Sequence, residues 1–290
     1  MAQPVGRVAY EPSSLSENSP RETPARGFHS AAIIETGEKG RIRAESFADH
    51  YSQARQFYLS QTVYEQAHIA SALVFELSKV EHMHVREAMV GHLRHIEEDL
   101  ASRVAAGLAF DKIPKAPVAA APVLEMKPSL SLQIIGKMKD TLMGRAIGIL
   151  IAEGSDGAVI KRIKKAATDA GATVKIVALK VGGTKLADGS MLAADGQLAG
   201  TPSVLFDAVA VILSDEGAKE LSIESAAIDF VRDAFGHLKA IAADKGGQVL
   251  LKTANVGQDA GVVDAKEKDA FIAAAKTRQW YREKSVRTLP

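Results

Sequence analysis

The sequence predicts an α/β protein with a doubly wound parallel sheet, preceded by an all-α helical segment and an extended N-terminal arm. Apolar side chains recur at helical spacing over residues 45–110, and a proline-rich stretch follows. Beyond it, apolar runs alternate with amphipathic helical patterns, which is typical of βαβ units. We expect four parts: an arm at 1–44, the helical segment at 45–113, a linker at 114–143 and the α/β domain at 144–290.

Composition allows two folded domains and excludes several functions. The chain has 290 residues, of which 47% are hydrophobic, and its net charge of +1 would not attract nucleic acid. The apolar run at 146–152 is far shorter than the ~20 residues needed to span a bilayer, and the start of the chain is unlike a signal peptide. We expect a cytoplasmic protein with no nucleic-acid or membrane partner. The absence of cysteine excludes disulfides, thiolate metal sites and a cysteine nucleophile.

The first 40 residues contain four of the ten prolines and show neither helical nor strand periodicity. We expect a disordered tail or an arm that lies on a partner. The linker contains Pro114, Pro117, Pro122 and Pro128 with alanines between them, a composition that favours extended chain without backbone hydrogen bonds.

The helical segment shows three patterns. One helical face carries Phe47, Tyr51, Ala54 and Tyr58. Thr62 and Glu65 then have capping-box spacing, in which each side chain accepts a hydrogen bond from a free backbone N–H, so a second helix starts there. Its apolar stripe is Ile69, Leu73, Leu77 and Val80. A third helical pattern continues over residues 85–108 until Gly107 and Pro114 stop it.

The α/β domain alternates strands and helices. The predicted strands are 147–152, 174–179, 209–213, 240–243 and 249–251. The predicted helices are one that carries Val159, Ile160, Ile163 and Ala167 and ends at Gly171, one over about 220–238 and one around 271–280. Together they form right-handed crossover units of a parallel sheet.

Six of the eight histidines lie in the helical segment, at positions 50, 68, 82, 84, 92 and 95. Their spacing argues against a metal site. His82 and His84 point to different sides of a helix, while His92 and His95 can share a face but lack the carboxylate of an HExxH motif. We predict solvated or hydrogen-bonded structural histidines and no metal ligands.

The turn at 153–157 joins a strand to a helix, where backbone N–H groups could hold an anion. Gly154 and Gly157 supply only part of a GxGxxG motif, and Asp156 places negative charge where a pyrophosphate would sit. Asp156 or Ser155 is better explained as the N-cap of the helix.

A second strand-to-helix turn, Asp244-Lys245-Gly246, followed by Gly247, has the form of an elbow without a nucleophile. Its glycines permit unusual backbone angles. Asp244 would need a neighbouring histidine to act as a base or nucleophile, and His237 lies on the preceding helix. We predict a turn carboxylate and no catalytic or cofactor-binding residue.

Much of the sequence resembles the haem catalases. Residues 6–15 and 19–28 resemble the segment that follows the haem-binding barrel of that family. Its helical domain is resembled by residues 46–55, 61–62, 68–69, 75–79, 85–86, 95–96 and 103–104. From about Gly144 onward, the sequence is similar to the extra domain of large-subunit catalases, which is related to PfpI-like, class I glutamine amidotransferase-like flavodoxin folds. The resemblance covers nearly the whole chain.

The resemblance implies that the sheet is flavodoxin-like. It also implies that the full-length family disproportionates hydrogen peroxide with haem, as a homotetramer. The partners of this chain would then be the catalase barrel domain and the neighbouring subunits. In that family the haem ligand and the distal residues belong to the barrel, so we expect no haem and no enzyme activity in this chain alone. The residues after Met1 look internal to the family, so we also expect a fragment of a longer protein.

In the PfpI-like relatives a cysteine occupies the elbow and an acidic residue assists it, whereas here Asp244 stands at the elbow and Val159 about where the acid would come. Thiol chemistry is therefore not expected. We predict a non-catalytic structural module that serves stability and oligomer assembly. An independent chaperone-like or protein-binding module remains the alternative, and a hydrolase lacks its nucleophile.

Overall fold

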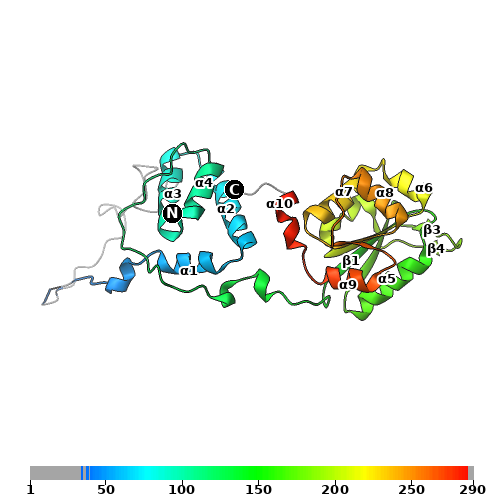
Figure 1. Ribbon diagram of the computed structural model, residues 1–290, viewed down its shortest axis with the longest axis horizontal. Coiled ribbons are helices and arrows are strands. Elements are labelled where there is room, and N and C mark those ends of the chain that lie inside the picture. Colours follow the sequence, from blue (N-terminus) through cyan, green and yellow to red (C-terminus); the bar gives the residue numbers. More distant parts are fainter. Residues whose placement is uncertain (1–33, 35–36, 39, 287–290) are drawn as a thin grey trace. The chain divides into compact units, whose positions relative to one another are not determined.

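The computed structural model describes residue 34, residues 37–38 and residues 40–286 (Figure 1). The arm predicted for 1–44 lies largely outside the described residues, as do the stretches 6–15 and 19–28 that carry part of the resemblance. No helix in the described part of the chain is long and apolar enough to cross a membrane.

The helical segment contains a 3-10 turn at Glu45–Ala48 and four α-helices: α1 (Ser52–Ser60), α2 (Val63–Ser78), α3 (Met83–Ile96) and α4 (Glu98–Gly107). The predicted capping box is confirmed. Thr62 N donates to the Glu65 carboxylate over 2.8 Å, and Glu65 N donates to Thr62 Oγ1 over 3.4 Å. Each end of this pair satisfies a backbone N–H that the first turn of α2 leaves free.

The helical pattern over residues 85–108 was expected to be continuous, and this was wrong. Glu97 is extended, with φ −161° and ψ 132°, and separates α3 from α4. Arg55 in α1 donates to the Ile96 carbonyl over 2.7 Å and also binds the Glu97 carboxylate. A continuous helix would direct that carbonyl to the N–H four residues later, so Arg55 takes the place of a helical bond.

The helical segment has a small core. Its buried members are Tyr58, Ala70, Leu77, Val90, Leu93, Leu100, Ala101, Val104 and Ala105. Ile69, Leu73 and Val80 of the predicted stripe are only partly buried. Tyr51 and Tyr58 lie on the buried side of the first predicted face, while Phe47 is exposed.

Residues 114–143 have no regular structure besides two 3-10 turns, Leu130–Leu132 and Ile135–Lys137. Side chains of the helices nevertheless bind this linker. Four of its backbone N–H groups donate to them: Val123 to Ser52 (2.7 Å), Ser129 to Ser60 (2.8 Å), and Ile134 and Ile135 to Glu65 (2.7 and 2.9 Å). The linker is thus attached to the helices by side-chain bonds that its own composition does not reveal.

The α/β domain contains a six-stranded sheet in the order β5-β2-β1-β6-β7-β8, with every pair parallel. Its strands are β1 (Ala146–Ile151), β2 (Thr173–Ala178), β5 (Gly196–Gln197), β6 (Ala208–Ile212), β7 (Ile241–Ala243) and β8 (Val262–Asp264). Without the short edge strand β5, the chain order across the sheet is 2-1-3-4-5, which is that of flavodoxin-like folds. The predicted fold class is confirmed. Strands β3 (Thr184–Lys185) and β4 (Met191–Leu192) form a separate hairpin.

Three predicted elements differ in the structure: the strand 249–251, the helix over 220–238 and the helix around 271–280. Residues 249–251 belong to α8 (Lys245–Thr253), whose buried side includes Leu250 and Leu251, and they do not form a strand. A short apolar run cannot distinguish a strand from the buried side of a helix. The sixth strand, β8, has no sequence signal strong enough to be predicted.

The helix predicted over 220–238 is two helices, α6 (Asp215–Leu221) and α7 (Ser225–Gly236). Leu221 and Ala227 are both fully buried although their spacing of six residues does not fit one helical face, so the chain turns between them. The last predicted helix ends earlier than expected: α9 covers Lys268–Ala275, and a 3-10 turn at Trp280–Arg282 and α10 (Glu283–Val286) follow it.

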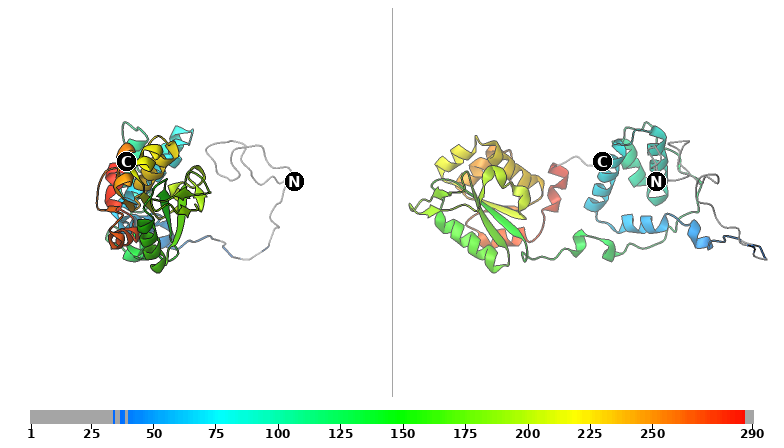
Figure 2. Two further views of the ribbon diagram at one scale, coloured as in Figure 1. Left: turned by 90° about the vertical axis from the view of Figure 1, so that its right-hand side faces the viewer. Right: turned by 180° about the vertical axis from the view of Figure 1, so that it is seen from behind.

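Helices cover both faces of the sheet (Figure 1, Figure 2). On one face α5 (Gly157–Asp169) and α9 pack against Ile147, Ile149 and Ile151, and on the other α6, α7 and α8 pack in the cluster that contains Leu150. This alternation along β1 is the two-residue period of a strand that is buried on both sides.

The C-terminal segment is fastened to the amino end of β7. The Arg282 guanidinium, of which 1% is exposed, makes two bonds of 2.6 Å to Asp259 and one of 2.7 Å to the Lys239 carbonyl. The Lys239 ammonium is buried as well and donates to the Ser203 carbonyl over 2.6 Å.

Candidate functional site

The elbow lies at the carboxyl end of β7, where parallel α/β sheets place their ligands. Asp244 is the N-cap of α8 and its carboxylate accepts from Gly247 N over 2.8 Å. The same carboxylate accepts from Leu213 N, with its two oxygens 3.1 and 3.0 Å away. Asp244 therefore braces the end of β6 against the start of α8. Burial raises the pKa of this carboxyl and the charge of Asp156 adds to the effect, while the backbone donors oppose it.

The elbow glycines have a role that differs from the predicted one. Gly246 and Gly247 do not have positive φ values. A Cβ at Gly246 would lie 2.1 Å from the Leu213 carbonyl oxygen, and one at Gly247 would lie 2.4 Å from that of Val211. Glycine is needed at both positions because the start of α8 lies in contact with the backbone at the end of β6, where a side chain would not fit.

The other elbow residues do not complete a catalytic set. The Lys245 ammonium lies 3.4 Å from Asp215 in an exposed ion pair. His237 is the C-cap of α7 and precedes the amino end of β7, so the length of that strand separates it from Asp244. Both oxygens of Asp244 face backbone donors. The absence of catalysis at the elbow stays a prediction. The geometry is that of a carboxylate that links two backbone segments by hydrogen bonds.

The turn after β1 is explained by capping. Asp156 Oδ1 accepts from Ala158 N and Val159 N over 2.8 and 3.1 Å, which confirms it as the N-cap of α5. Ser155 is fully buried, and its hydroxyl donates to the Ile212 carbonyl at 2.6 Å. The Ser155 bond links the turn after β1 to the end of β6.

A cavity of about 510 Å³ lies beside the elbow. Its polar lining consists of Asp156, Asp244, Lys245, Gln248, Gln258, Asp264 and Lys266. Val159 lines it too, so the structure brings Val159 and Asp244 to the same cavity. Several of these groups are already engaged: Gln258 donates to Gln248 over 2.6 Å, and Asp244 and Asp156 cap helices.

The histidines of the helical segment form separate contacts. His92 Nδ1 lies 2.7 Å from the Tyr51 hydroxyl and His95 Nε2 lies 2.7 Å from the Pro117 carbonyl, while both rings stack on Tyr51. His68 Nε2 lies 3.0 Å from Glu283. Solvated or hydrogen-bonded histidines were predicted, and hydrogen bonding is confirmed for these three. Among the described residues, no group of three or more potential ligands could hold a metal ion.

The residues present at these sites do not fit haem. Haem iron takes an axial ligand such as His or Tyr inside a largely closed pocket. The elbow cavity is lined mainly by charged and amide side chains and contains neither residue type. In the helical segment, His92 and His95 are bonded to neighbouring groups.

A second cavity, of about 220 Å³, lies at the carboxyl ends of β1 and β2 and was not predicted from the sequence. Its lining includes Glu153 after β1, Lys180 after β2, Lys185 on the hairpin and Glu220 on α6. These residues come from four separate elements and share no local motif. The one available signal was the position of Glu153 and Lys180 directly after predicted strands.

The structure thus defines a doubly wound α/β domain that follows a four-helix segment. Two family models match these parts. Residues 44–108 match the catalase-related immune-responsive domain, and residues 143–278 match the C-terminal domain found in long catalases.

Individual relatives agree with the family models. Catalase C of Rhizobium meliloti is 45% identical over 294 residues, which cover 99% of this chain and 42% of that protein. Catalase HPII of Pseudomonas aeruginosa is 35% identical over 98% of this chain and 41% of its own length. Catalase-2 of Bacillus subtilis is 32% identical over 93% and 39%, respectively. The chain spans about two fifths of the length of these curated relatives. It belongs to the catalase family and corresponds to the C-terminal part of the large catalases.

Proposed function

We propose that this chain is the non-catalytic C-terminal module of a haem catalase and serves the stability and oligomer assembly of that enzyme. In the full-length protein, hydrogen peroxide would be disproportionated at a haem held by the barrel domain. This module would contribute no haem ligand and no catalytic residue. The match to both C-terminal family models supports the proposal.

The exposure of large apolar side chains in the helical segment is the observation that carries the proposal. Phe57, Val63, Phe75 and Met83 are 43, 68, 60 and 54% exposed. Contiguous exposed apolar surface marks protein contacts, and we propose that these side chains contribute to such a surface. The partners we propose are the barrel domain and the neighbouring subunits of a homotetramer, which would remove these side chains from water.

A graft into a relative tests the assembly role. In Catalase C of Rhizobium meliloti, the C-terminal part is deleted or replaced by this chain. We expect the deletion to lose assembly and heat resistance, measured by analytical ultracentrifugation and by the half-life of activity, and we expect the graft to restore both. A deletion protein that assembles and resists heat like its parent would contradict the proposal.

Point variants of the graft sharpen the test. Phe75→Ser and Val63→Ser should weaken assembly, because each would bring a hydroxyl to an apolar contact. Ile223→Ser is the matched control, since Ile223 is 88% exposed but belongs to the α/β domain. Equal effects of all three variants would show that the helical segment is not the contact surface.

The proposal also predicts that the isolated chain has no catalase activity. After incubation with haem and gel filtration, the chain should show no Soret absorption and should release no oxygen from peroxide. A Soret band that stays with the protein, together with oxygen release, would contradict this.

The same exposed side chains favour a second candidate function, an independent chaperone-like module that holds apolar segments of other proteins. In this case the isolated chain would suppress the aggregation of a heat-unfolded enzyme, and Phe75→Ser would reduce the effect. Suppression by a chain that fails to restore assembly in the graft would favour this function over the first.

A further inference from the structure

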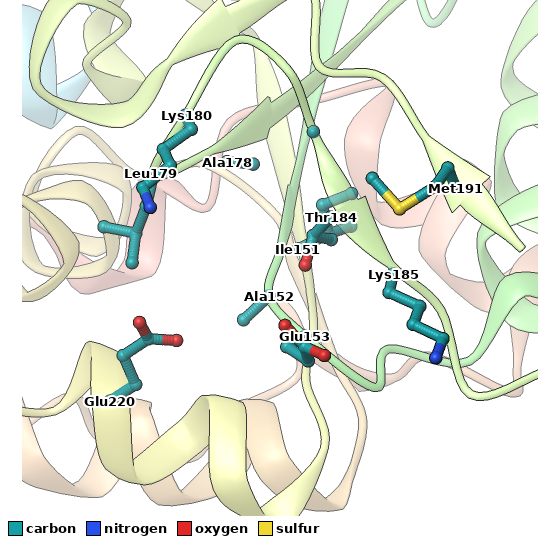
Figure 3. Close-up of a pocket in the computed structure, with 11 residues that line it drawn as sticks. Ile151, Ala152, Glu153, Ala178, Leu179, Lys180, Thr184, Lys185, Met191 and Glu220 are labelled. Carbon is teal, nitrogen blue, oxygen red and sulfur yellow. The ribbon is translucent and has the colours of Figure 1, made fainter. Parts of the chain in front are cut away.

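The cavity at the carboxyl ends of β1 and β2 combines an apolar floor with charged walls (Figure 3). Ile151, Ala152, Ala178 and Leu179 contribute the apolar part of its lining. Its position is that at which parallel α/β sheets bind ligands. At about 30 Å³ per water molecule, its volume of about 220 Å³ holds about seven waters, which suits a small metabolite.

The charged walls carry two groups of each sign: Glu153 and Glu220, and Lys180 and Lys185. Within the described residues, none of these four side chains forms an ion pair or a hydrogen bond. The elbow cavity differs, because Lys245 pairs there with Asp215 and Asp244 caps α8. The four side chains of the smaller cavity are exposed and open to a ligand.

The charged residues are held apart on fixed elements. Ser214 is the N-cap of α6 and its hydroxyl donates to the Glu153 carbonyl over 2.5 Å, which fixes the helix of Glu220 against the turn of Glu153. Gly154 N donates to the Lys185 carbonyl over 2.8 Å, which fixes the hairpin on the same turn. In Figure 3, Glu220 and Lys180 extend from opposite sides into one space, and Lys185 lies on the hairpin side.

We propose that this cavity binds a small zwitterion, namely a free amino acid with an apolar side chain. The lysines would bind its carboxylate, the glutamates its ammonium group, and the apolar floor its side chain. A simple anion would face the repulsion of two carboxylates, and a simple cation that of two ammonium groups. The inference rests on this cavity alone and does not depend on the proposed role in a catalase.

Three probes separate a zwitterion from a single charge. L-leucine carries both charges, N-acetyl-L-leucine lacks the ammonium group, and L-leucinamide lacks the carboxylate. Each is titrated into the full chain with methyl-labelled Ile and Met, followed by NMR. We expect L-leucine to give saturable shifts of the Met191 and Ile151 methyl resonances. Each of the other two probes should bind more weakly by about tenfold or more, because each loses one charged contact.

Variants with matched controls locate the site. Glu220→Gln and Lys180→Gln should each weaken L-leucine binding about tenfold or more. Glu216→Gln and Lys219→Gln are exposed positions of α6 outside the cavity lining, and they should bind like the parent. The inference is overturned if no methyl of the cavity shifts, if either single-charge probe binds as tightly as L-leucine, or if the cavity variants bind L-leucine like the controls.

Discussion

The α/β domain and the helical segment differ in how much of their apolar surface they bury themselves. The sheet has an extensive buried cluster on each face, whereas the helices share one small cluster. Large side chains such as Phe75 and Val63 stay exposed on the helices. Because burial of apolar surface is the main source of stability, we expect the α/β domain to fold alone and the helical segment to be stabilised by the partner that we propose.

Separate expression of the two regions tests most directly whether their stabilities differ. We expect residues 142–290 to unfold in urea in one cooperative transition. Residues 44–137 should have a stability below about 3 kcal/mol, as expected for a small core without a partner. Circular dichroism follows both transitions. A helical piece that is as stable and cooperative as the α/β piece would show that its core is sufficient and that the exposed side chains have another explanation.

Two phenylalanine truncations compare the cores at single positions. Phe230 is 1% exposed and its ring centroid lies 6.2 Å from that of Phe206, so Phe230→Ala should lower the free energy of unfolding by about 3–5 kcal/mol. Phe75 is 60% exposed, so Phe75→Ala should change it by less than about 0.5 kcal/mol in this chain. Urea unfolding of each variant, followed by circular dichroism, measures the change in the free energy of unfolding. Similar losses in both variants would contradict the difference between the regions.

The elements that the sequence predicted correctly depend on neighbours along the chain. The Thr62–Glu65 capping box and the Asp156 N-cap are set within three residues, and β1 and β6 are long apolar runs. The break at Glu97 could not be predicted, because it involves Arg55, which lies 42 residues earlier. The same holds for the linker, whose backbone is bound by side chains of α1 and α2.

The candidate sites show the same limit. The position of Asp244 after β7 was visible in the sequence, but the two donors that bind its carboxylate are Leu213 N, just after β6, and Gly247 N in α8. The role of Gly246 follows from the nearby Leu213 carbonyl and not from its own backbone angles. The smaller cavity joins four separate elements. The turns can be located from the sequence, but their contacts depend on residues far away along the chain.

The pKa of Lys239 reports how far water is excluded from the amino edge of the sheet. Burial, and secondarily the charge of Arg278, lower the pKa of Lys239 from 10.5 to about 8. Between these two values the unfolded chain binds more protons than the folded one, so the free energy of unfolding rises with pH across this window, and below it the full destabilisation is present. We expect a rise of about 2 kcal/mol between roughly pH 7.5 and 9.5. Lys239→Met should lack this rise in urea titrations followed by circular dichroism. An equal rise in both proteins would assign it to other groups.

The smallest expected effect concerns the two aspartate caps of the α/β domain, which differ in burial. Asp244 is partly buried and serves Leu213 N and Gly247 N, whereas Asp156 is exposed and serves Ala158 N and Val159 N. Asp244→Ala should lower the free energy of unfolding by about 1–2 kcal/mol, because two backbone donors lose their acceptor where water has limited access.

Asp156→Ala should lower the free energy of unfolding by no more than about 1 kcal/mol, since water replaces the lost acceptor. The raised pKa of Asp244 gives a further distinction. A folded-state pKa above the unfolded value favours folding at low pH, and this contribution is lost as the pH rises through the folded pKa. Asp244→Asn removes that charge and keeps one acceptor, so at neutral pH it should destabilise less than Asp244→Ala. If Asp244→Asn were the more damaging of the two, the carboxylate charge itself would hold the elbow together, and the balance between burial and backbone donors at this site would be the reverse of the one inferred from its pKa.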